Sequence, residues 1–499
     1  MEKFFHSVIL DKEKCMGCTN CIKRCPTEAI RVRDGKAQII SERCIDCGEC
    51  IRVCPHHAKR ARFDHLSELD NYSADRLPAP ALFGQFNNLD DIDIVLTGLK
   101  KMGFDEVYEV ARSAELVSDA TRKLMQQGHL ERPIISSACP AVVRLIRVRF
   151  PELCSHVLPL NSPMETAARF VKKEARKKTG LPLEKIGAFF ITPCPAKVTD
   201  TKCPISTKTS YVDGAIAISE IFPALVEKME KAETVEPLMQ CGVIGVGWAS
   251  SGGEAAALLN DKYLAADGVD NVIRVLEELE DERIKELDFI ELNACAGGCV
   301  GGVLCVENAY VAKARLQRLR RYLPVSQNHL EEGIPPCMQW QDNLEFAPVL
   351  KLSDDMGEAL RMMADIDKIC DKLPGLDCGS CGAPTCRAFA RMWSADLRKK
   401  MSASLSCARK LNRSPKRSPL WEVLCQGIIR RPIPMNVEQV CKQLELHVLV
   451  GEDLSREVTG GYTGDLLSWV MARLPADAVW FTVMGTVNAI AVASLADAA

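Results

Sequence analysis

Cysteines are the residues of this chain most able to do chemistry, and there are 24 of them among 499 residues. Eight stand in the first 54 residues, in two runs spaced Cys-x-x-Cys-x-x-Cys-x-x-x-Cys, each followed directly by proline. Thiolates at such short spacing ligate iron–sulfur clusters or zinc, whereas disulfides belong to oxidising compartments. We therefore expect metal ligation inside a reducing, anaerobic cell.

The two N-terminal runs have the spacing of bacterial two-cluster ferredoxins, in which the fourth cysteine of each run ligates the other run's cluster. The proline after each fourth cysteine ends the local helix. Zinc is the alternative, although zinc domains rarely double a four-cysteine run. The resemblance implies two 4Fe–4S ligand sets. The first is Cys15, Cys18, Cys21 and Cys54, and the second is Cys44, Cys47, Cys50 and Cys25.

Three later loops carry four more thiols, the number that one 4Fe–4S cluster needs. They are residues 136–140 (SSACP), 192–197 (TPCPAK) and 291–302 (ELNACAGGCVGG). Glycines in the third loop let the backbone approach a bulky ligand closely. Lys197, three residues after Cys194, offers a fixed positive charge to an anionic ligand. The alternative interpretation is that these are ordinary core cysteines in tight turns.

The order and spacing of these loops resemble the three signatures of the iron-only (FeFe) hydrogenases, over roughly residues 1–310. The resemblance implies an H-cluster, a 4Fe–4S cluster bridged to a di-iron subcluster that splits dihydrogen heterolytically. Lys197 takes the position of the lysine that hydrogen-bonds a cyanide ligand, and Cys299 takes the bridging position. The segment 250–254 (SSGGE) resembles a glycine motif beside the cofactor. The implied cluster ligands are Cys139, Cys194, Cys295 and Cys299, and the implied cofactor-binding residues are Trp248, Ser250 and Gly301.

Departures from the family pattern point to a divergent member. Ala138 stands where the family has a proton-relaying cysteine, and a methyl group neither donates nor accepts a proton. We therefore expect slow turnover unless water or Ser137 relays the proton. Asn293 and Thr192 replace methionines, and Asp200 replaces a glutamate. This combination resembles the branches of the family to which a sensory role is attributed.

The resemblance implies a hydrogenase that passes electrons through its 4Fe–4S clusters to ferredoxin or other redox subunits. The implied partners are dihydrogen, protons and the proteins that build a di-iron site, with a homo-oligomer or a larger complex open. One alternative is a hydrogen sensor that signals through its C-terminal domains. Another is an electron-transfer subunit without di-iron. A related group of iron–sulfur assembly proteins keeps the cysteines without di-iron chemistry, but Lys197 and both complete ferredoxin sets argue against that group.

The order of the elements predicts an α/β multidomain protein. We expect a two-cluster ferredoxin-like α+β domain at 1–66, a connector at 67–86 and an α/β H-cluster domain at 87–345. Within the last, helix-like segments at 90–102 and 113–127 alternate with apolar, strand-like runs. Those runs are 133–136, 186–192, 242–246 and 288–292.

Beyond residue 350 we expect a small helical cluster domain at 350–411. Its run Cys378, Cys381, Cys386, with Cys407 as fourth ligand, resembles the single-cluster domain of corrinoid iron–sulfur proteins, and zinc is the alternative. A basic, proline-rich linker at 412–434 follows. Residues 435–499 contain SREVTGG at 455–461 and resemble the DRTGG domain, a small α/β module. The chain ends soon after an apolar run, so we expect that domain to be incomplete.

Bulk composition excludes several classes of protein. The formal net charge is −3, which suggests neither nucleic acid nor an anionic membrane as a partner. No apolar run reaches 18 residues, so no transmembrane helix is expected. The opening apolar stretch is too short for a signal peptide, and we expect a cytoplasmic protein.

Overall fold

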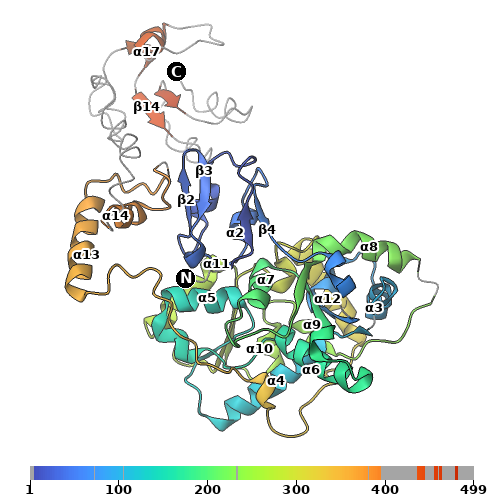
Figure 1. Ribbon diagram of the computed structural model, residues 1–499. Helices are drawn as coiled ribbons and strands as arrows, with labels where there is room; N and C mark the ends of the chain where they lie inside the picture. The colour runs from blue at the N-terminus through green and yellow to red at the C-terminus, as the bar shows by residue number, and fades with distance from the viewer. Residues whose placement is uncertain are drawn as a thin grey trace. The chain divides into compact units, whose positions relative to one another are not determined.

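The structure is a computed structural model of the chain (Figure 1). It describes residues 5–71, 73–104, 106–231, 234–379 and 381–394, and then only 435–443, 455–458, 460–463 and 478–481. Two compact units divide the chain, 1–399 and 400–499. Cys407 and the expected linker at 412–434 lie outside the described residues. No helix in the described part has the length and apolarity that crossing a bilayer requires.

The N-terminal cysteine runs fold into a small α+β module with an internal repeat. Strand β1 (Val8–Leu10) pairs antiparallel with β4 (Lys59–Ala61), and β2 (Ile30–Arg33) forms a hairpin with β3 (Lys36–Ile39). Each Cys-x-x-Cys-x-x-Cys run leads into one helical turn, α1 (Asn20–Lys23) or α2 (Glu49–Arg52). The core between these elements combines the cysteines with aliphatic side chains from the strands and helical turns.

Two parallel sheets form the frame of the next 250 or so residues. The first has the order β6-β5-β8-β9, and the second has the order β10-β11-β7. Because all their strands run parallel, the C-terminal ends of neighbouring strands lie at one edge, where α/β folds place their sites. The strands are β5 (Ser73–Pro78), β6 (Glu106–Val107), β7 (Ile134–Ile135), β8 (Ile186–Thr192), β9 (Gly214–Ala217), β10 (Tyr263–Asp267) and β11 (Phe289–Asn293).

Helices cover these sheets and bury an apolar face against them (Figure 1). The longest is α4, whose N-terminal half is buried and whose end is capped by Gly128 at a φ of 72°. The helices are α3 (Ile92–Lys101), α4 (Val110–Gln127), α5 (Pro140–Arg149), α6 (Pro163–Thr179), α7 (Pro195–Lys202), α8 (Ile218–Glu230), α9 (Val243–Gly247), α10 (Gly253–Ala257), α11 (Val269–Glu280) and α12 (Ala309–Leu319).

Two predictions from the sequence are wrong. The run at 242–246 is helical, as α9, and packs against α4 where Gly245 lies close to the backbone of Ala111. Five small apolar residues suit a buried helix as well as a strand. The supposed connector 67–86 contains β5, which pairs with β6 and β8 inside the first sheet. Pro78 is the last residue of the strand. The polar residues Ser73, Asp75 and Arg76 interrupt the apolar pattern by which a buried strand is predicted from a sequence.

The first unit ends in two helices, α13 (Met356–Cys370) and α14 (Cys386–Ser394), joined by the Cys378–Cys381 loop. In the second unit, β12 (Met435–Asn436) pairs antiparallel with β13 (Glu457–Val458), and β14 (Gly460–Thr463) pairs parallel with β15 (Ala478–Phe481). The only described helix there is α17 (Val437–Gln443). The mixture of helix and parallel strand fits the α/β character expected of the tail.

Candidate functional site

The eight N-terminal cysteines surround two separate cavities. The structure draws three thiols of the first run together with Cys54 of the second, and three thiols of the second run together with Cys25 of the first. Backbone amides point at these sulfurs, because the amides of Ala29, Ala37 and Ala58 donate to Cys25, Cys15 and Cys54 at 3.2–3.3 Å. Such donors stabilise thiolate and cluster sulfur.

A buried cation lies between the two cavities. Lys59 is 2% exposed, and among the described residues its Nζ has no hydrogen-bond partner. Burial raises the pKa of Cys21 to about 11 and of Cys50 to about 12, and the charge of Lys59 opposes both shifts. An unpaired buried ammonium is costly unless an anion lies beside it. Four thiolates with an iron–sulfur core supply that anion, so the residues present fit the expected clusters.

The four thiols of the third set come from the ends of three parallel strands. Cys139 follows β7 and begins α5, and Cys194 follows β8 and begins α7. Cys295 and Cys299 follow β11. Burial raises the pKa of Cys194 to about 11 and of Cys299 to about 12, and the other thiols of the set raise both further. Four buried thiols this close to one another need a metal to hold them as thiolates.

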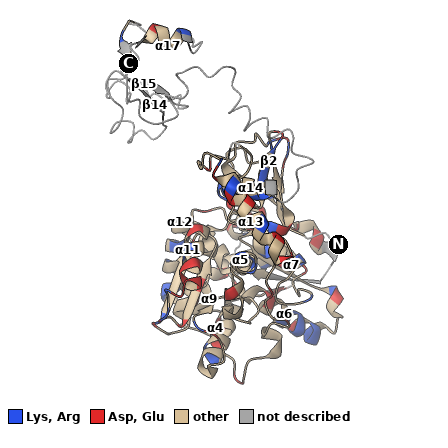
Figure 2. Ribbon diagram, turned by 90° about the vertical axis from the view of Figure 1, so that its left-hand side faces the viewer, with Lys and Arg blue, Asp and Glu red and all other residues tan. Residues whose placement is uncertain are grey.

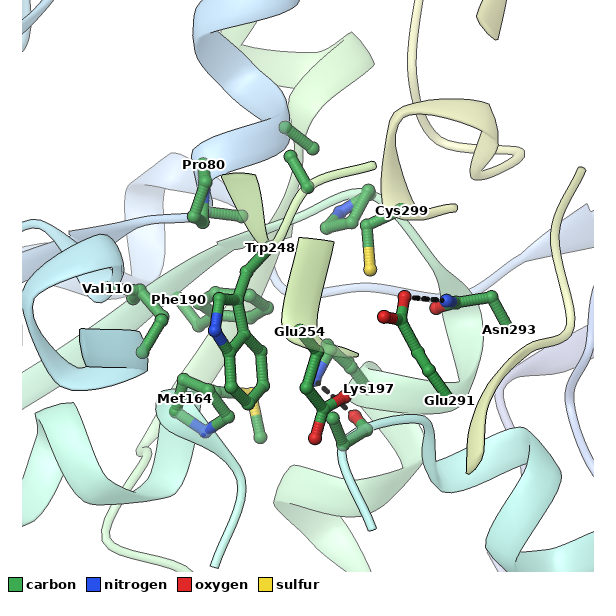
Figure 3. Close-up of a pocket in the computed structure, with 17 residues that line it drawn as sticks. Pro80, Val110, Met164, Phe190, Lys197, Trp248, Glu254, Glu291, Asn293 and Cys299 are labelled. Carbon is green, nitrogen blue, oxygen red and sulfur yellow. Dashed lines mark hydrogen bonds between the residues drawn. The ribbon is translucent and has the colours of Figure 1, made fainter. Parts of the chain in front are cut away.

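A cavity of about 580 Å³ opens beside Cys299 (Figure 3). Apolar side chains, with Trp248, Met164 and Phe190 the largest, make most of its wall. Lys197, Glu254 and Glu291 are its charged groups. In Figure 3 the sulfur of Cys299 and the carboxylates of Glu254 and Glu291 come from different elements and lie around one space.

Lys197 is held in place within this cavity. Its Nζ donates to the carbonyl oxygen of Ala138 at 3.2 Å and lies over the ring of Phe190, 5.9 Å from the centroid. Its charge lowers the pKa of Cys194 and Cys299 against the effect of burial. A cation with spare donors next to a bridging-position thiol fits an anionic group bound on that sulfur.

The two carboxylates differ in their hydrogen bonding. Glu291 accepts from the amides of Gly252 and Ala255, at 3.0 and 2.8 Å, and from the side chain of Asn293 at 2.7 Å. Glu254 has the hydroxyl of Ser136 at 2.6 Å. Burial, and then the charge of Glu291, raise the pKa of Glu254 to about 8. Burial and the neighbouring carboxylate thus favour the protonated form of Glu254.

The structure brings together most of the residues singled out from the sequence, but not all. Ala138, Lys197, Trp248 and Cys299 line the cavity, whereas Ser250 and Gly301 do not. The carbonyl of Gly301 accepts from Arg52 of the N-terminal module at 2.7 Å, which places it on the other side of the set.

Some pocket residues were not recognised as functional. Glu254 and Glu291 had no role assigned, although both stand in quoted motifs. A glutamate inside the apolar strand β11, and another directly after two glycines, were the available signals. Ser137 is also not a relay here, since its hydroxyl donates to the carbonyl of Leu160 at 2.8 Å and does not line the cavity.

The C-terminal cysteines form a looser group. Cys378 and Cys381 are exposed and Cys386 is partly buried. The charges of Cys378 and Cys386 help to raise the pKa of Cys381, after burial and against a backbone hydrogen bond. Cys407 lies outside the described residues, and Cys370 is close enough to Cys386 for that thiol to raise its pKa.

Three family profiles match the chain. The iron only hydrogenase large subunit, C-terminal domain, matches residues 77–303. The 4Fe-4S dicluster domain matches 7–55, and an Fe-S cluster family matches 373–395. The three matched segments contain the three cysteine groups described above.

Curated relatives are similar over part of their length. Iron hydrogenase 1 of Clostridium pasteurianum is 23% identical over 269 residues, 44% of this chain and 46% of that protein. The periplasmic [Fe] hydrogenase large subunit of Nitratidesulfovibrio vulgaris is 29% identical over 212 residues, 38% of this chain and 50% of that protein. The chain thus spans about half the length of these relatives.

The chain is also similar to an Fe-S cluster assembly factor and to a solved hydrogenase structure. The cytosolic Fe-S cluster assembly factor nar1 of Aspergillus flavus is 25% identical over 137 residues, 27% of this chain and 24% of that protein. Among solved structures, an [FeFe]-hydrogenase HydA1 variant from Chlamydomonas reinhardtii matches with a TM-score of 0.45 and 16% identity, covering 56% of this chain and 95% of that one.

Buried cysteine sets, a parallel α/β frame and a dicluster module define an iron–sulfur oxidoreductase fold. Residues 77–303 match the C-terminal domain of the iron only hydrogenase large subunit, so this part of the chain is FeFe-hydrogenase-like.

Proposed function

We propose that this protein is a slow FeFe-type hydrogenase that cleaves dihydrogen reversibly. The observation that carries the proposal is the cavity in which Cys299, Lys197 and the buried carboxyl of Glu254 meet. Cys139, Cys194, Cys295 and Cys299 would hold the 4Fe–4S part of an H-cluster, and the di-iron part would lie in the cavity. When bound, the H-cluster supplies heterolytic dihydrogen cleavage, and the other clusters carry single electrons.

The residues of the cavity have separate tasks in this proposal. Lys197 orients an anionic ligand through its Nζ, and the backbone carbonyl of Ala138 fixes that ammonium. Trp248, Met164 and Phe190 exclude water, which strengthens every charge interaction inside. Asn293 and two backbone amides hold Glu291 as the second carboxylate.

Glu254 takes over proton handling that Ala138 does not perform. Its Oε2 lies 2.6 Å from the hydroxyl oxygen of Ser136, which also accepts from the amide of Ala138 at 3.1 Å. A carboxyl group that lines the cavity and has a raised pKa suits general acid–base exchange with the reacting site. We expect this substitute to be slower than a relay through a thiol at position 138.

Infrared spectroscopy of protein purified without oxygen from its native host tests the proposal. Carbonyl and cyanide bands that shift under hydrogen support a working H-cluster. Absence of those bands, with iron near sixteen atoms per chain as four cubanes require, would contradict it. That result would instead favour an electron-transfer role without di-iron.

Ala138→Cys tests whether position 138 limits turnover. A thiol there faces the cavity, and a positioned acid–base group contributes about 100-fold or more. We expect hydrogen evolution to rise by at least about tenfold. An unchanged rate, with the infrared bands retained, would show that the methyl group is not the bottleneck.

A hydrogen sensor is the second candidate, favoured by the same methyl group at position 138. A sensor needs dihydrogen to change the state of the cofactor but needs no fast turnover. The two candidates separate in one measurement. Hydrogen-dependent infrared shifts together with little or no hydrogen turnover in the wild-type chain would favour the sensor.

A further inference from the structure

The loop that carries Cys378 and Cys381 lies against the N-terminal cysteine module. The amide of Val32 donates to the carbonyl of Gly382 at 2.9 Å. Val32 is opposite Ala37 in the β2–β3 hairpin, yet its amide bonds the loop, so the loop covers the open edge of β2. An uncovered edge strand exposes backbone groups that can pair with other chains. The loop pairs with this edge, and we call the contact between Gly382 and Val32 the seat of the loop. Both views show α14 beside β2 (Figures 1 and 2).

Two glycines make this approach possible. Gly382 has a φ of 80°, and a Cβ there would lie 1.9 Å from the carbonyl oxygen of Val32. Gly379 has a φ of 78°, and a Cβ there would meet Ile22 at 3.2 Å and Thr19 at 3.5 Å. Helix α14 adds an ion pair between Arg391 and Glu28 at 3.1 Å.

The residues that receive the loop also enclose the first N-terminal set. Thr19 and Val32 line the cavity of Cys15, Cys18, Cys21 and Cys54. The second set faces the other way. A Cβ on Gly48, which lines its cavity, would lie 2.7 Å from Val303 and 3.5 Å from Pro195, the neighbour of Cys194.

We infer that the C-terminal cysteine group exchanges electrons with the Cys15 set, which makes it the outer end of one path leading through the Cys44 set to Cys299. Each exchange moves one electron: one cluster is oxidised as its neighbour is reduced, and no bond or proton changes. The inference depends on the proposed cluster loading and not on di-iron chemistry. Because Cys378 and Cys381 are exposed, an external one-electron carrier would meet the chain at this loop.

Electron paramagnetic resonance of the full chain, reduced with dithionite, tests the inference without measuring hydrogen turnover. Neighbouring reduced clusters broaden and split one another's signals. We expect Cys381→Ser to remove about four iron atoms per chain and to simplify the signals of the N-terminal pair. Unchanged iron content, or unchanged N-terminal signals after that loss, would overturn the inference.

Gly382→Ala tests the seat itself, and Gly375→Ala is its matched control. Gly375 also has a positive φ, 65°, but a Cβ there meets nothing within 4 Å. We expect the magnetic interaction to weaken in Gly382→Ala and to persist in Gly375→Ala. An interaction that stays at its original strength in Gly382→Ala, with all iron retained, would overturn the inference.

Hydrogen exchange provides a second test if Gly382→Ala loses its iron. In the wild-type chain the amide of Val32 donates to the carbonyl of Gly382. Cys381→Ser should release the loop and speed the exchange of that amide by tenfold or more. Equal exchange rates in the two proteins would overturn the inference. Infrared bands report separately on the di-iron site, so a failed hydrogenase proposal would leave this result unaffected.

Discussion

The N-terminal module and the cavity beside Cys299 each contain a lysine among cysteine thiols, Lys59 in the first and Lys197 in the second. The two lysines differ in the polar groups that lie beside them. Lys59 has no hydrogen-bond partner among the described residues and lies between two cysteine sets. Lys197 bonds the carbonyl of Ala138 and shares its cavity with Glu254 and Glu291. A cation alone among thiols suits storage of electrons. A cation together with carboxyl groups also suits movement of protons, so chemistry beyond electron transfer belongs to the second site.

The sharpest way to break this comparison is Cys299→Ser. Removing the thiol in the bridging position should abolish hydrogen turnover and all carbonyl and cyanide bands, while the signals of the N-terminal clusters remain. Cys305→Ala is the control, since Cys305 is also buried and contacts the carbonyl of Cys299 at 3.7 Å without belonging to the set. Retained bands in Cys299→Ser would show that the cavity holds no group on that sulfur.

Glu254→Gln tests the claim that carboxyl groups set the cavity apart. The amide cannot supply the proton, so we expect hydrogen evolution to fall about 100-fold with the infrared bands unchanged. Glu109→Gln is a matched control, because burial raises the pKa of Glu109 to about 6 in a place outside the cavity. Equal rates of hydrogen evolution in Glu254→Gln and Glu109→Gln would show that proton transfer by Glu254 does not distinguish the cavity from the N-terminal module.

Lys59→Met tests whether Lys59 sets the reduction potentials of the two N-terminal clusters. Loss of a buried positive charge disfavours the reduced, more negative form of each cluster, so both reduction potentials should become more negative. We expect shifts on the order of 50 mV, or about 1 kcal/mol per electron, in redox titrations. Lys12→Met, at an exposed position, should change neither potential. A shift in one cluster alone would contradict the shared role of Lys59.

Thr199→Val should have the smallest effect and tests how the two regions are joined. The hydroxyl of Thr199, on α7, donates to the carboxylate of Asp46 at 2.8 Å, and that carboxylate also binds the amides of Ser7 and Val8. The same hydroxyl accepts from the amide of Ser7 at 3.1 Å and lies 2.9 Å from its side-chain oxygen, so its loss costs about 1 kcal/mol or more. We expect Tm to fall by a few degrees with iron content unchanged. In Thr201→Val, whose hydroxyl bonds only within α7, a smaller change is expected.

Local patterns in the sequence foretold much of the frame. Helices α3 and α4 and strands β8 and β11 lie where apolar periodicity placed them. Each cysteine loop follows a strand, as expected. The sequence did not predict strand β5, because SADRLP has no apolar run and ends in proline, and because its partner β8 lies over a hundred positions away.

The character of the cavity was harder to predict than its cysteines. Glu254 and Glu291 share the site only because α10 and β11 are packed together, through hydrogen bonds between Glu291 and the start of α10. Both carboxyl groups are buried, and the three donors to Glu291 against one to Glu254 favour the proton on Glu254. The spacing of residues in the sequence predicts neither this packing nor this burial. The resemblance to a hydrogenase pointed to position 138 but not to its substitute.

The position of Lys59 also affects how substitutions can adapt such a module in evolution. One ammonium touches the electrostatics of thiols from both N-terminal sets. Loss of that positive charge moves both potentials in the same direction, so the absolute level shifts more than the step between them. The module can thus be matched to a new electron carrier by a single replacement. Making the step between its two halves steeper requires changes elsewhere, at residues that face one set alone.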